Sequence, residues 1–294
     1  MRSETRVVAE HFLNLPLVYR LGTQWIGYVP TVISYALSQG VADLSYFFYK
    51  SAVDNVKKNL ALVFPDASEI KLSHMTRQLF RNYSKYLVDY GRFTWMKKTD
   101  ILKQITYFDG REKLQSALQM NRGIILLTAH LGNWELGGIF FESYGLTTNI
   151  ITAPDENIEI ASIRSLYRER FGVKTITIGT SPFSTMQLTR ALENKEIVAM
   201  LIDRYHEKNH GVSTEFFHKP TTFPRGPFIL SRLTGAVIIV AFVIRERDGY
   251  RGIIEGPFEV TDEKDEHVIL RKVINILEKH IIMYPDQWYN FVPI

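Results

Sequence analysis

His130 and Glu135 are the two residues whose types and spacing most clearly suggest chemistry. They belong to the segment Ala129-His-Leu-Gly-Asn-Trp-Glu135, which follows a continuous apolar run over residues 123–129. Such a run, bounded by turn residues, is typical of a buried parallel strand, and α/β proteins place their chemistry at the carboxyl ends of these strands. A histidine in that position can act as a general base, and a neighbouring carboxylate can hold its imidazole in one tautomer.

The spacing of this pair predicts a strand-to-helix turn. Residues five apart in one α-helix lie about 140° apart around its axis, so His130 and Glu135 can meet only if His130 precedes the helix and Glu135 lies in its first turn. Asn133 suits the N-cap position of that helix, and Glu135 would then be kept ionised by the positive helix end. The backbone amides of Gly132 and Asn133 would be available to stabilise an oxyanion. From the spacing alone, the alternative is a histidine that is satisfied locally and a glutamate that merely caps a helix.

Alternating helices and buried strands are expected to position this turn. The pattern predicts strands at 105–108, 123–129, 148–152, 175–178 and 197–202 and a hairpin of 236–244 with 250–254, and helices at 52–63, 69–95, 111–120, 133–144, 157–171, 184–194, 226–234 and 264–283. A long polar loop is expected between 202 and 226. This order indicates an α/β fold with a mostly parallel central sheet flanked by helices.

The first fifty residues are predicted to form a helical membrane-associating region. Residues 21–42 carry no charge and are long enough to span a bilayer, but several polar side chains and Pro30 make the segment a poor spanning helix. Aromatic residues between Trp25 and Tyr49 favour an interfacial position. We therefore expect residues 1–50 to associate with a membrane, peripherally or as a single anchor, and residues 51–294 to form the catalytic domain. The alternative is a helix pair that packs on the protein's own core.

The composition excludes several kinds of chemistry. The chain of 294 residues has no cysteine, so disulfides, thiolate metal sites and a cysteine nucleophile are excluded. Its net charge of +4 fits an anionic partner, but it does not distinguish a phospholipid from a phosphate or a nucleic acid.

The segment 121–138 resembles the signature of bacterial lipid A biosynthesis acyltransferases of the lauroyl/myristoyl type. That group belongs with the glycerolipid acyltransferases that share a His-x4-Asp/Glu motif. Further segments resemble the family in the same order, at 59–66, 167–172, 201–203, 211–226 and 284–291.

The resemblance implies transfer of an acyl chain from a thioester of acyl carrier protein or coenzyme A to a hydroxyl of a membrane glycolipid, such as a lipid A precursor. His130 would be the general base and Glu135 its orienting acid. No cofactor, metal, covalent enzyme intermediate or nucleic-acid partner is expected. The protein would act at the cytoplasmic face of the inner membrane.

The resemblance also assigns roles to four further side chains. Arg168 and Arg170 would hold a phosphate or another anionic group of the acceptor, or would orient the catalytic pair. Asp203 would position substrate or pair with an arginine, and Arg225 is a further candidate for binding an anion.

Two features leave the acceptor open. Arg204 follows Asp203 where the family more often has a neutral polar residue or a histidine, and the sequence ends without a basic tail. Relatives of this kind acylate phosphatidylinositol mannosides and other glycolipids, so an acceptor of that type is the alternative.

A different class of function is suggested by His206-Glu-x-x-His210, which matches the zinc-protease pattern HExxH. That pattern requires a helix, whereas this segment is polar and is followed at once by Gly211, so we expect a chance match in a loop. A zinc protease and a lipid-binding protein without activity remain the alternatives.

Overall fold

The computed structural model describes residues 26–153, 158–179, 183–204 and 211–294, and the chain divides into two compact units. Unit 1 comprises Met1–Met96 with Pro285–Ile294, and unit 2 comprises Lys97–Tyr284. The predicted division of roles between residues 1–50 and 51–294 stays a prediction.

Unit 2 is built on a seven-stranded sheet with the order β1-β9-β8-β2-β5-β3-β4. β8, β2, β5, β3 and β4 are parallel to one another, whereas β9 is antiparallel to β8, and β1 is parallel to β9. The strands are β1 (Ile105–Asp109), β2 (Ile124–Thr128), β3 (Thr148–Thr152), β4 (Lys174–Thr177), β5 (Ile197–Leu201), β8 (Val237–Glu246) and β9 (Gly249–Phe258). The predicted α/β fold with a mostly parallel central sheet is therefore confirmed.

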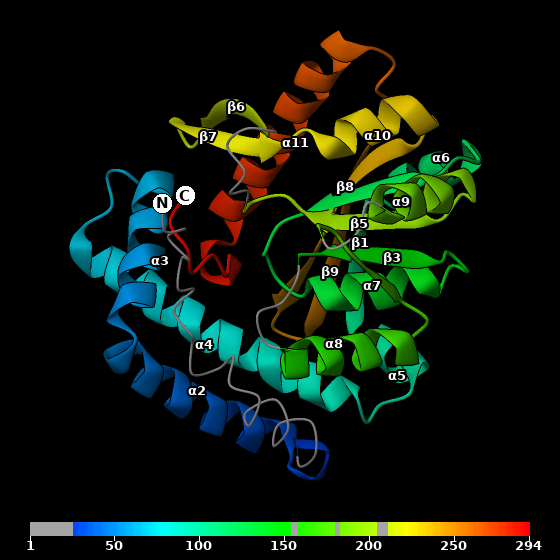
Figure 1. Ribbon diagram of the computed structural model, residues 1–294. Helices are drawn as coiled ribbons and strands as arrows, with labels where there is room; N and C mark the ends of the chain where they lie inside the picture. The colour runs from blue at the N-terminus through cyan, green and yellow to red at the C-terminus, as the bar shows by residue number, and fades with distance from the viewer. Residues whose placement is uncertain (1–25, 154–157, 180–182, 205–210) are drawn as a thin grey trace. The chain divides into compact units, whose positions relative to one another are not determined.

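Helices cover both faces of this sheet. Figure 1 shows α10 and α11 on one side and α7 and α8 on the other. The helices of unit 2 are α5 (Lys98–Leu102), α6 (Arg111–Gln119), α7 (Trp134–Glu142), α8 (Ile158–Arg170), α9 (Phe183–Glu193), α10 (Gly226–Thr234) and α11 (Glu263–Met283). Leu114 of α6 and Phe141 of α7 join Leu126 and Ala241 in one buried cluster, which fastens these two helices to the same face of the sheet. β2 is buried along its whole length, as expected for a strand covered on both faces.

The segment between β5 and α10 differs from its prediction. Instead of a polar loop, β6 (Gly211–Phe216) and β7 (Lys219–Pro224) form an antiparallel hairpin. Phe217 and His218 make its two-residue turn with φ values of 48° and 60°, the conformation that matches the twist of a hairpin. Phe216 and Phe223 are buried, so tertiary packing favours strands where the polar residues around them suggested a loop.

Unit 1 is helical, and the last ten residues of the chain pack against its helices. After η2 (Ile26–Tyr28) come α2 (Thr31–Phe48), α3 (Lys50–Val63) and α4 (Glu69–Phe93), which is capped by Ser68 as expected. Asn59 donates to the carbonyls of Asn290 and Val292, and Asn82 donates to Asp286, so that η3 (Pro285–Gln287) and the last residues are held against α3 and α4.

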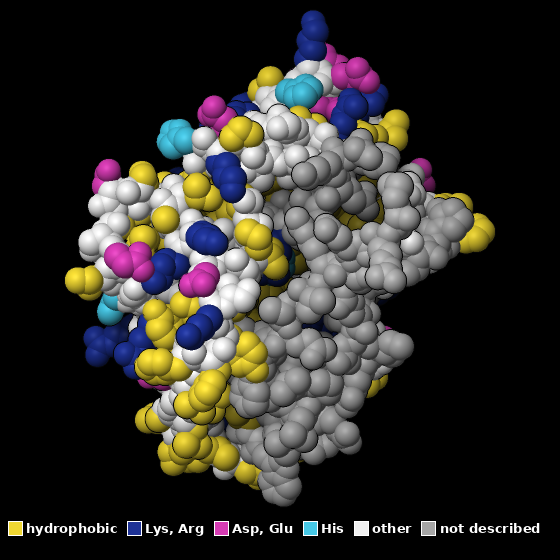
Figure 2. All heavy atoms as spheres, turned by 60° about the vertical axis from the view of Figure 1, so that its left-hand side comes forward, with side chains coloured by type: hydrophobic (Ala, Val, Ile, Leu, Met, Phe, Trp, Pro, Cys, Tyr) yellow, Lys and Arg dark blue, Asp and Glu magenta, His cyan; other side chains and the backbone are white. Residues whose placement is uncertain are grey.

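One face of α2 packs on α4, and another is apolar and exposed. Tyr35 donates to Asp89, and Asp43 pairs with Arg77 and Arg81. The exposed apolar side chains of α2 are Val32, Ile33, Leu37, Val41, Leu44, Phe47 and Phe48. In Figure 2, hydrophobic side chains gather over the lower part of the view, at the height where Figure 1 draws α2. Among the described helices, none combines the length and the apolar character needed to cross a bilayer.

Candidate active site

The parallel register of β2 and β5 places His130 beside Asp203. The strands pair Ile124 with Ile197 and Thr128 with Leu201, a constant offset that pairs His130 with Asp203 two residues beyond the strand ends. The backbone N–H of His130 donates to Asp203 Oδ2 at 3.1 Å, and its ring Nδ1 lies 2.8 Å from Asp203 Oδ1. Both residues therefore stand at the carboxyl ends of adjacent central strands, where α/β folds place catalytic groups.

This pairing determines which nitrogen of His130 can act as a base. An ionised carboxylate only accepts hydrogen bonds, so Nδ1 carries the proton and Nε2 keeps its lone pair. Burial lowers the pKa of the imidazole below its usual value, the positive charge of Arg204 lowers this pKa further, and the Asp203 carboxylate opposes both effects. The ring is therefore neutral near neutral pH, and its side chain is still 21% exposed.

The turn after His130 is held by close contact with β8. Gly132 has φ of 68°, and a Cβ there would lie 2.1 Å from the carbonyl oxygen of Val243, so only glycine fits. The backbone N–H of Asn133 donates to that carbonyl at 2.7 Å. The Asn133 side chain accepts from the N–H of Leu136, which confirms the predicted N-cap of α7, and donates to the hydroxyl of Tyr250. The amide of Asn133 is thus directed at β8, which argues against the oxyanion role expected for it.

Glu135 lies in the first turn of α7, as expected, but its partner is Arg168 of α8. Arg168 Nη2 donates to Oε1 at 2.6 Å and Nε donates to Oε2 at 3.0 Å, a bidentate pair whose side chains are 8% and 4% exposed. Burial alone would raise the pKa of Glu135, but the charge and hydrogen bonds of Arg168, with contributions from Arg164 and Trp134, keep it below the usual value. Within the described residues, the carboxylate bonded to the His130 ring is Asp203 rather than Glu135. A role for Glu135 in orienting His130 stays a prediction.

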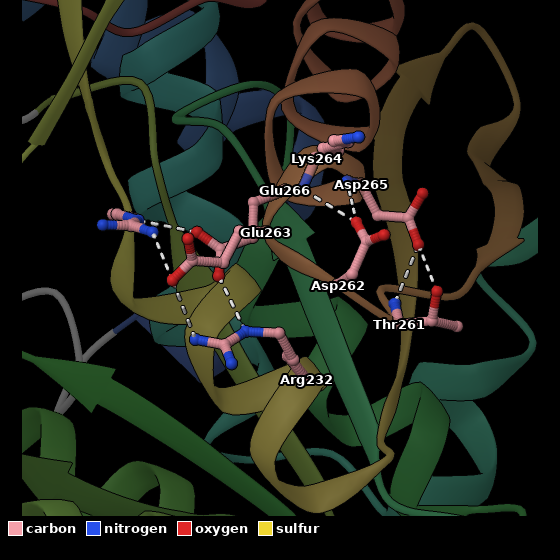
Figure 3. A network of polar contacts seen from close by, with 8 residues as sticks. Arg232, Thr261, Asp262, Glu263, Lys264, Asp265 and Glu266 are labelled. Atoms are coloured by element: carbon pink, nitrogen blue, oxygen red, sulfur yellow. Dashed lines mark hydrogen bonds and ion pairs between the residues drawn. The ribbon is translucent and has the colours of Figure 1, made fainter.

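The other predicted anion-binding arginines have different surroundings. Arg170 is exposed and lies over the ring of Phe171, with 5.6 Å from the guanidinium carbon to the ring centre. Arg225 donates to the buried Glu266 at 2.6 Å, as part of a cluster in which Arg232 also faces Glu266 (Figure 3). Neither contact involves His130, and anion binding by these two residues stays a prediction.

A narrow apolar cavity is lined by Trp134, a residue that contacts the histidine. The ring of Trp134 meets the His130 ring edge to face at 5.3 Å between centroids, and Trp134 also lines the cavity. The floor is formed by residues two apart in neighbouring strands, among them Leu126 with Thr128 and Ala199 with Leu201. α7 forms the roof, with Gly137, Gly138, Phe140 and Phe141. The volume is about 40 Å³, so a long ligand would have to displace lining side chains such as Met200.

The HExxH residues His206, Glu207 and His210 lie outside the described residues. Among the described part of the chain, no group of three His, Cys, Asp or Glu side chains is arranged to hold a metal.

The described residues thus combine an α/β fold with an imidazole that is paired with a carboxylate at the strand ends, close to an apolar cavity lined by Trp134. The sequence profile of the bacterial lipid A biosynthesis acyltransferases matches residues 13–293. The chain therefore belongs to this family and is an acyltransferase.

Curated relatives carry two kinds of name. The chain is 27% identical over 266 residues to a phosphatidylinositol mannoside acyltransferase of Mycolicibacterium smegmatis, covering 88% of this chain and 85% of the relative. It is 26% identical over 278 residues to the lipid A biosynthesis palmitoleoyltransferase of Escherichia coli K12, covering 92% and 87%. It is 25% identical over 275 residues to the lipid A biosynthesis lauroyltransferase of the same organism, covering 91% and 87%.

Reasoning from the sequence missed the pairing of His130 with Asp203 and the presence of Arg164 near the site. Both strands and Asp203 itself were predicted, but only their adjacency in the sheet brings the side chains together. A signal for Arg164 was available, because it precedes Arg168 by one helical turn and so shares a face of α8 with it.

Proposed function

We propose that the protein transfers a fatty acyl chain from an acyl thioester to a hydroxyl of a membrane glycolipid, with His130 as the general base. The single observation that supports this best is the Asp203–His130 pair, because it leaves Nε2 able to accept a proton next to Trp134, a residue that lines the apolar cavity. The family and the names of the relatives agree with a glycolipid acceptor.

The chemistry proceeds through the imidazole without a covalent enzyme intermediate. Nε2 of His130 takes the proton of the acceptor hydroxyl while its oxygen attacks the thioester carbonyl, and Asp203 stabilises the imidazolium that forms. The tetrahedral intermediate then breaks its C–S bond, and the thiolate of coenzyme A or acyl carrier protein leaves with the proton from His130. An ester bond is formed, a thioester bond is lost, and the imidazole is neutral again.

The apolar cavity under α7 is the proposed seat of the acyl chain. Apart from Thr128, Thr148 and the indole of Trp134, its lining consists of apolar side chains and glycines. Burying an acyl chain there would contribute about 0.8 kcal/mol per methylene, which orients the carbonyl carbon toward His130 at the Trp134 end.

Cations around the base suit an anionic acceptor or donor. Arg204 and Arg164 both lie close enough to His130 for their charges to lower its pKa. Guanidinium groups bind phosphate well, so we propose that these two residues, rather than Arg168, attract a phosphate of the lipid or of the thioester carrier. Arg168 instead holds Glu135 and thereby the first turn of α7.

The exposed face of α2 is the proposed membrane contact of unit 1. Its apolar side chains end in Phe47 and Phe48, and the exposed Lys50 follows them, a combination that suits the headgroup layer of an anionic bilayer. This would hold the protein at the cytoplasmic face of the inner membrane as a peripheral protein. Leu37→Glu with Leu44→Glu should abolish co-sedimentation with anionic vesicles. The exposed Ile70 of α4 and Val268 of α11 provide a matched control, because Ile70→Glu with Val268→Glu adds the same two negative charges outside α2.

The deciding experiment uses the purified protein with lauroyl-coenzyme A and two acceptors, a lipid A precursor and a phosphatidylinositol mannoside. Mass spectrometry of the lipids should find one of them heavier by one acyl group, and His130→Ala should abolish this product. Unchanged transfer by His130→Ala would exclude the proposed base. No transfer from either coenzyme A or acyl carrier protein thioesters to either lipid would exclude the proposed substrates, and stoichiometric zinc in active protein would favour the metal-dependent alternative.

A further inference from the structure

A pair of aromatic rings lines both the apolar cavity and a second hollow next to it. Phe108 of β1 and Phe140 of α7 stand with their centroids 5.0 Å apart and their planes tilted by 54°. Phe140 follows Trp134 by six residues, which is about 9 Å along the helix. Trp134 contacts the His130 ring and lines the cavity, so Phe140 lines the cavity at a point farther along α7 from the histidine.

A second hollow lies directly behind these rings. It is open to solvent, has a volume of about 300 Å³, and is lined by Leu102, Ile105, Phe108, Arg111, Phe140, Ser143 and Tyr144. Ile105, Phe108 and Phe140 also line the narrow cavity, so the two spaces share a wall. The Arg111 guanidinium lies over the Phe108 ring, with 5.3 Å from its central carbon to the ring centre, on the side of the open hollow.

We propose that Phe108 and Phe140 are specificity-determining residues that set the longest acyl chain the enzyme accepts. This inference rests on the proposed acyl transfer and adds to it which side chains terminate the acyl seat. A chain that reaches the rings meets a wall, and a longer chain must bend or displace an aromatic pair that is packed against the core cluster. Arg111 stabilises the wall from outside, because a cation over a ring face favours one ring position.

The contacts explain why this wall is more selective than the rest of the lining. Phe141, the next residue of α7, also borders the cavity but belongs to the buried core and does not reach the open hollow. Removing the Phe140 ring would join the cavity to the hollow, whereas removing the Phe141 ring would only widen the cavity itself. Phe140→Ala and Phe141→Ala therefore form a test variant and its matched control.

The test compares wild type, Phe140→Ala, Phe108→Ala and Phe141→Ala with saturated acyl-coenzyme A donors that differ in steps of two carbons. Products are quantified by mass spectrometry, and kcat/KM is obtained for each length. For Phe140→Ala and Phe108→Ala we expect kcat/KM for donors beyond the wild-type limit to rise relative to the preferred donor. The rise should be roughly tenfold for two additional carbons and roughly a hundredfold for four, since each newly buried methylene contributes about fourfold. For Phe141→Ala we expect an unchanged upper limit.

A second variant, which adds a large side chain next to the space left by Phe140→Ala, keeps the test decisive if removal of the ring lowers the stability of the protein. Leu102→Trp in the Phe140→Ala background narrows the hollow behind the removed ring and should return the limit toward that of wild type. An unchanged limit in both wall variants, with acyl transfer intact, overturns this inference and leaves the proposed function standing. Loss of transfer from every donor by the wild-type protein itself would instead count against the proposed function.

Discussion

Asp203→Asn is the substitution that tests the arrangement of the base most directly. The carboxylate contacts His130 twice, once at the backbone N–H and once at ring Nδ1. An asparagine has one acceptor oxygen and one donor nitrogen, so it cannot accept both hydrogen bonds. If its oxygen faces the ring, its NH₂ opposes the backbone N–H. If its NH₂ faces the ring, Nδ1 must accept, the proton moves to Nε2, and the base is lost.

The expected decrease in kcat follows from the loss of the tautomer that carries its proton on Nδ1. Replacing the orienting carboxylate of a histidine base costs roughly 10³- to 10⁴-fold in kcat, or about 4–5.5 kcal/mol of transition-state stabilisation. The Asp203 side chain is fully buried, so the lost charged hydrogen bond should also lower the free energy of unfolding by about 1.5–3 kcal/mol. Removing the carboxylate also lowers the pKa of His130 further, because Asp203 raises it.

The assay measures acylation of the lipid acceptor by mass spectrometry across a pH series, together with chemical unfolding of each variant. Asp262→Asn is a matched control, because Asp262 caps α11 on the surface and asparagine caps equally well. A kcat for Asp203→Asn within about threefold of wild type, with the same pH profile, would refute the reasoning.

The remaining predictions concern the surroundings of the same base. Arg168→Met should lower the free energy of unfolding by about 3–5 kcal/mol because it leaves Glu135 buried without its counter-charge, and the added substitution Glu135→Gln should recover part of this loss in a denaturant titration. Arg204→Gln should raise the pKa of His130, because the positive charge of Arg204 lowers it. Since the base must be neutral, the acidic limb of the pH profile of kcat/KM should then move to higher pH. This shift is opposite to the one expected when the Asp203 carboxylate is removed. Gly132→Ala should destabilise the protein by at least about 1–3 kcal/mol and impair acyl transfer, because the φ of 68° and the carbonyl of Val243 leave no room for a Cβ; a melting temperature equal to that of wild type would contradict this.

Much of unit 2 was predictable because its strands and helices carry strong local signals. The apolar run of β2, the N-cap at Asn133 and the hairpin of β8 and β9 were all predicted near their observed bounds. The hairpin of β6 and β7 was not, because its strands are stabilised by burial of a few phenylalanines rather than by a regular pattern. Local periodicity reports the environment of a segment only when most of its residues share that environment.

What the sequence by itself determined is the local structure around His130: a histidine after a buried strand, a glycine that permits the turn, and a cap that starts the next helix. These are local properties, set by backbone conformation and by hydrogen bonds between near neighbours. Which carboxylate holds the imidazole was decided only by the tertiary structure. His130 and Asp203 meet because β2 and β5 are adjacent and in a fixed register, whereas Glu135, only five residues from His130, is drawn to Arg168 across the α7–α8 contact. Strand order and register depend on how the whole sheet packs, and no short segment encodes them.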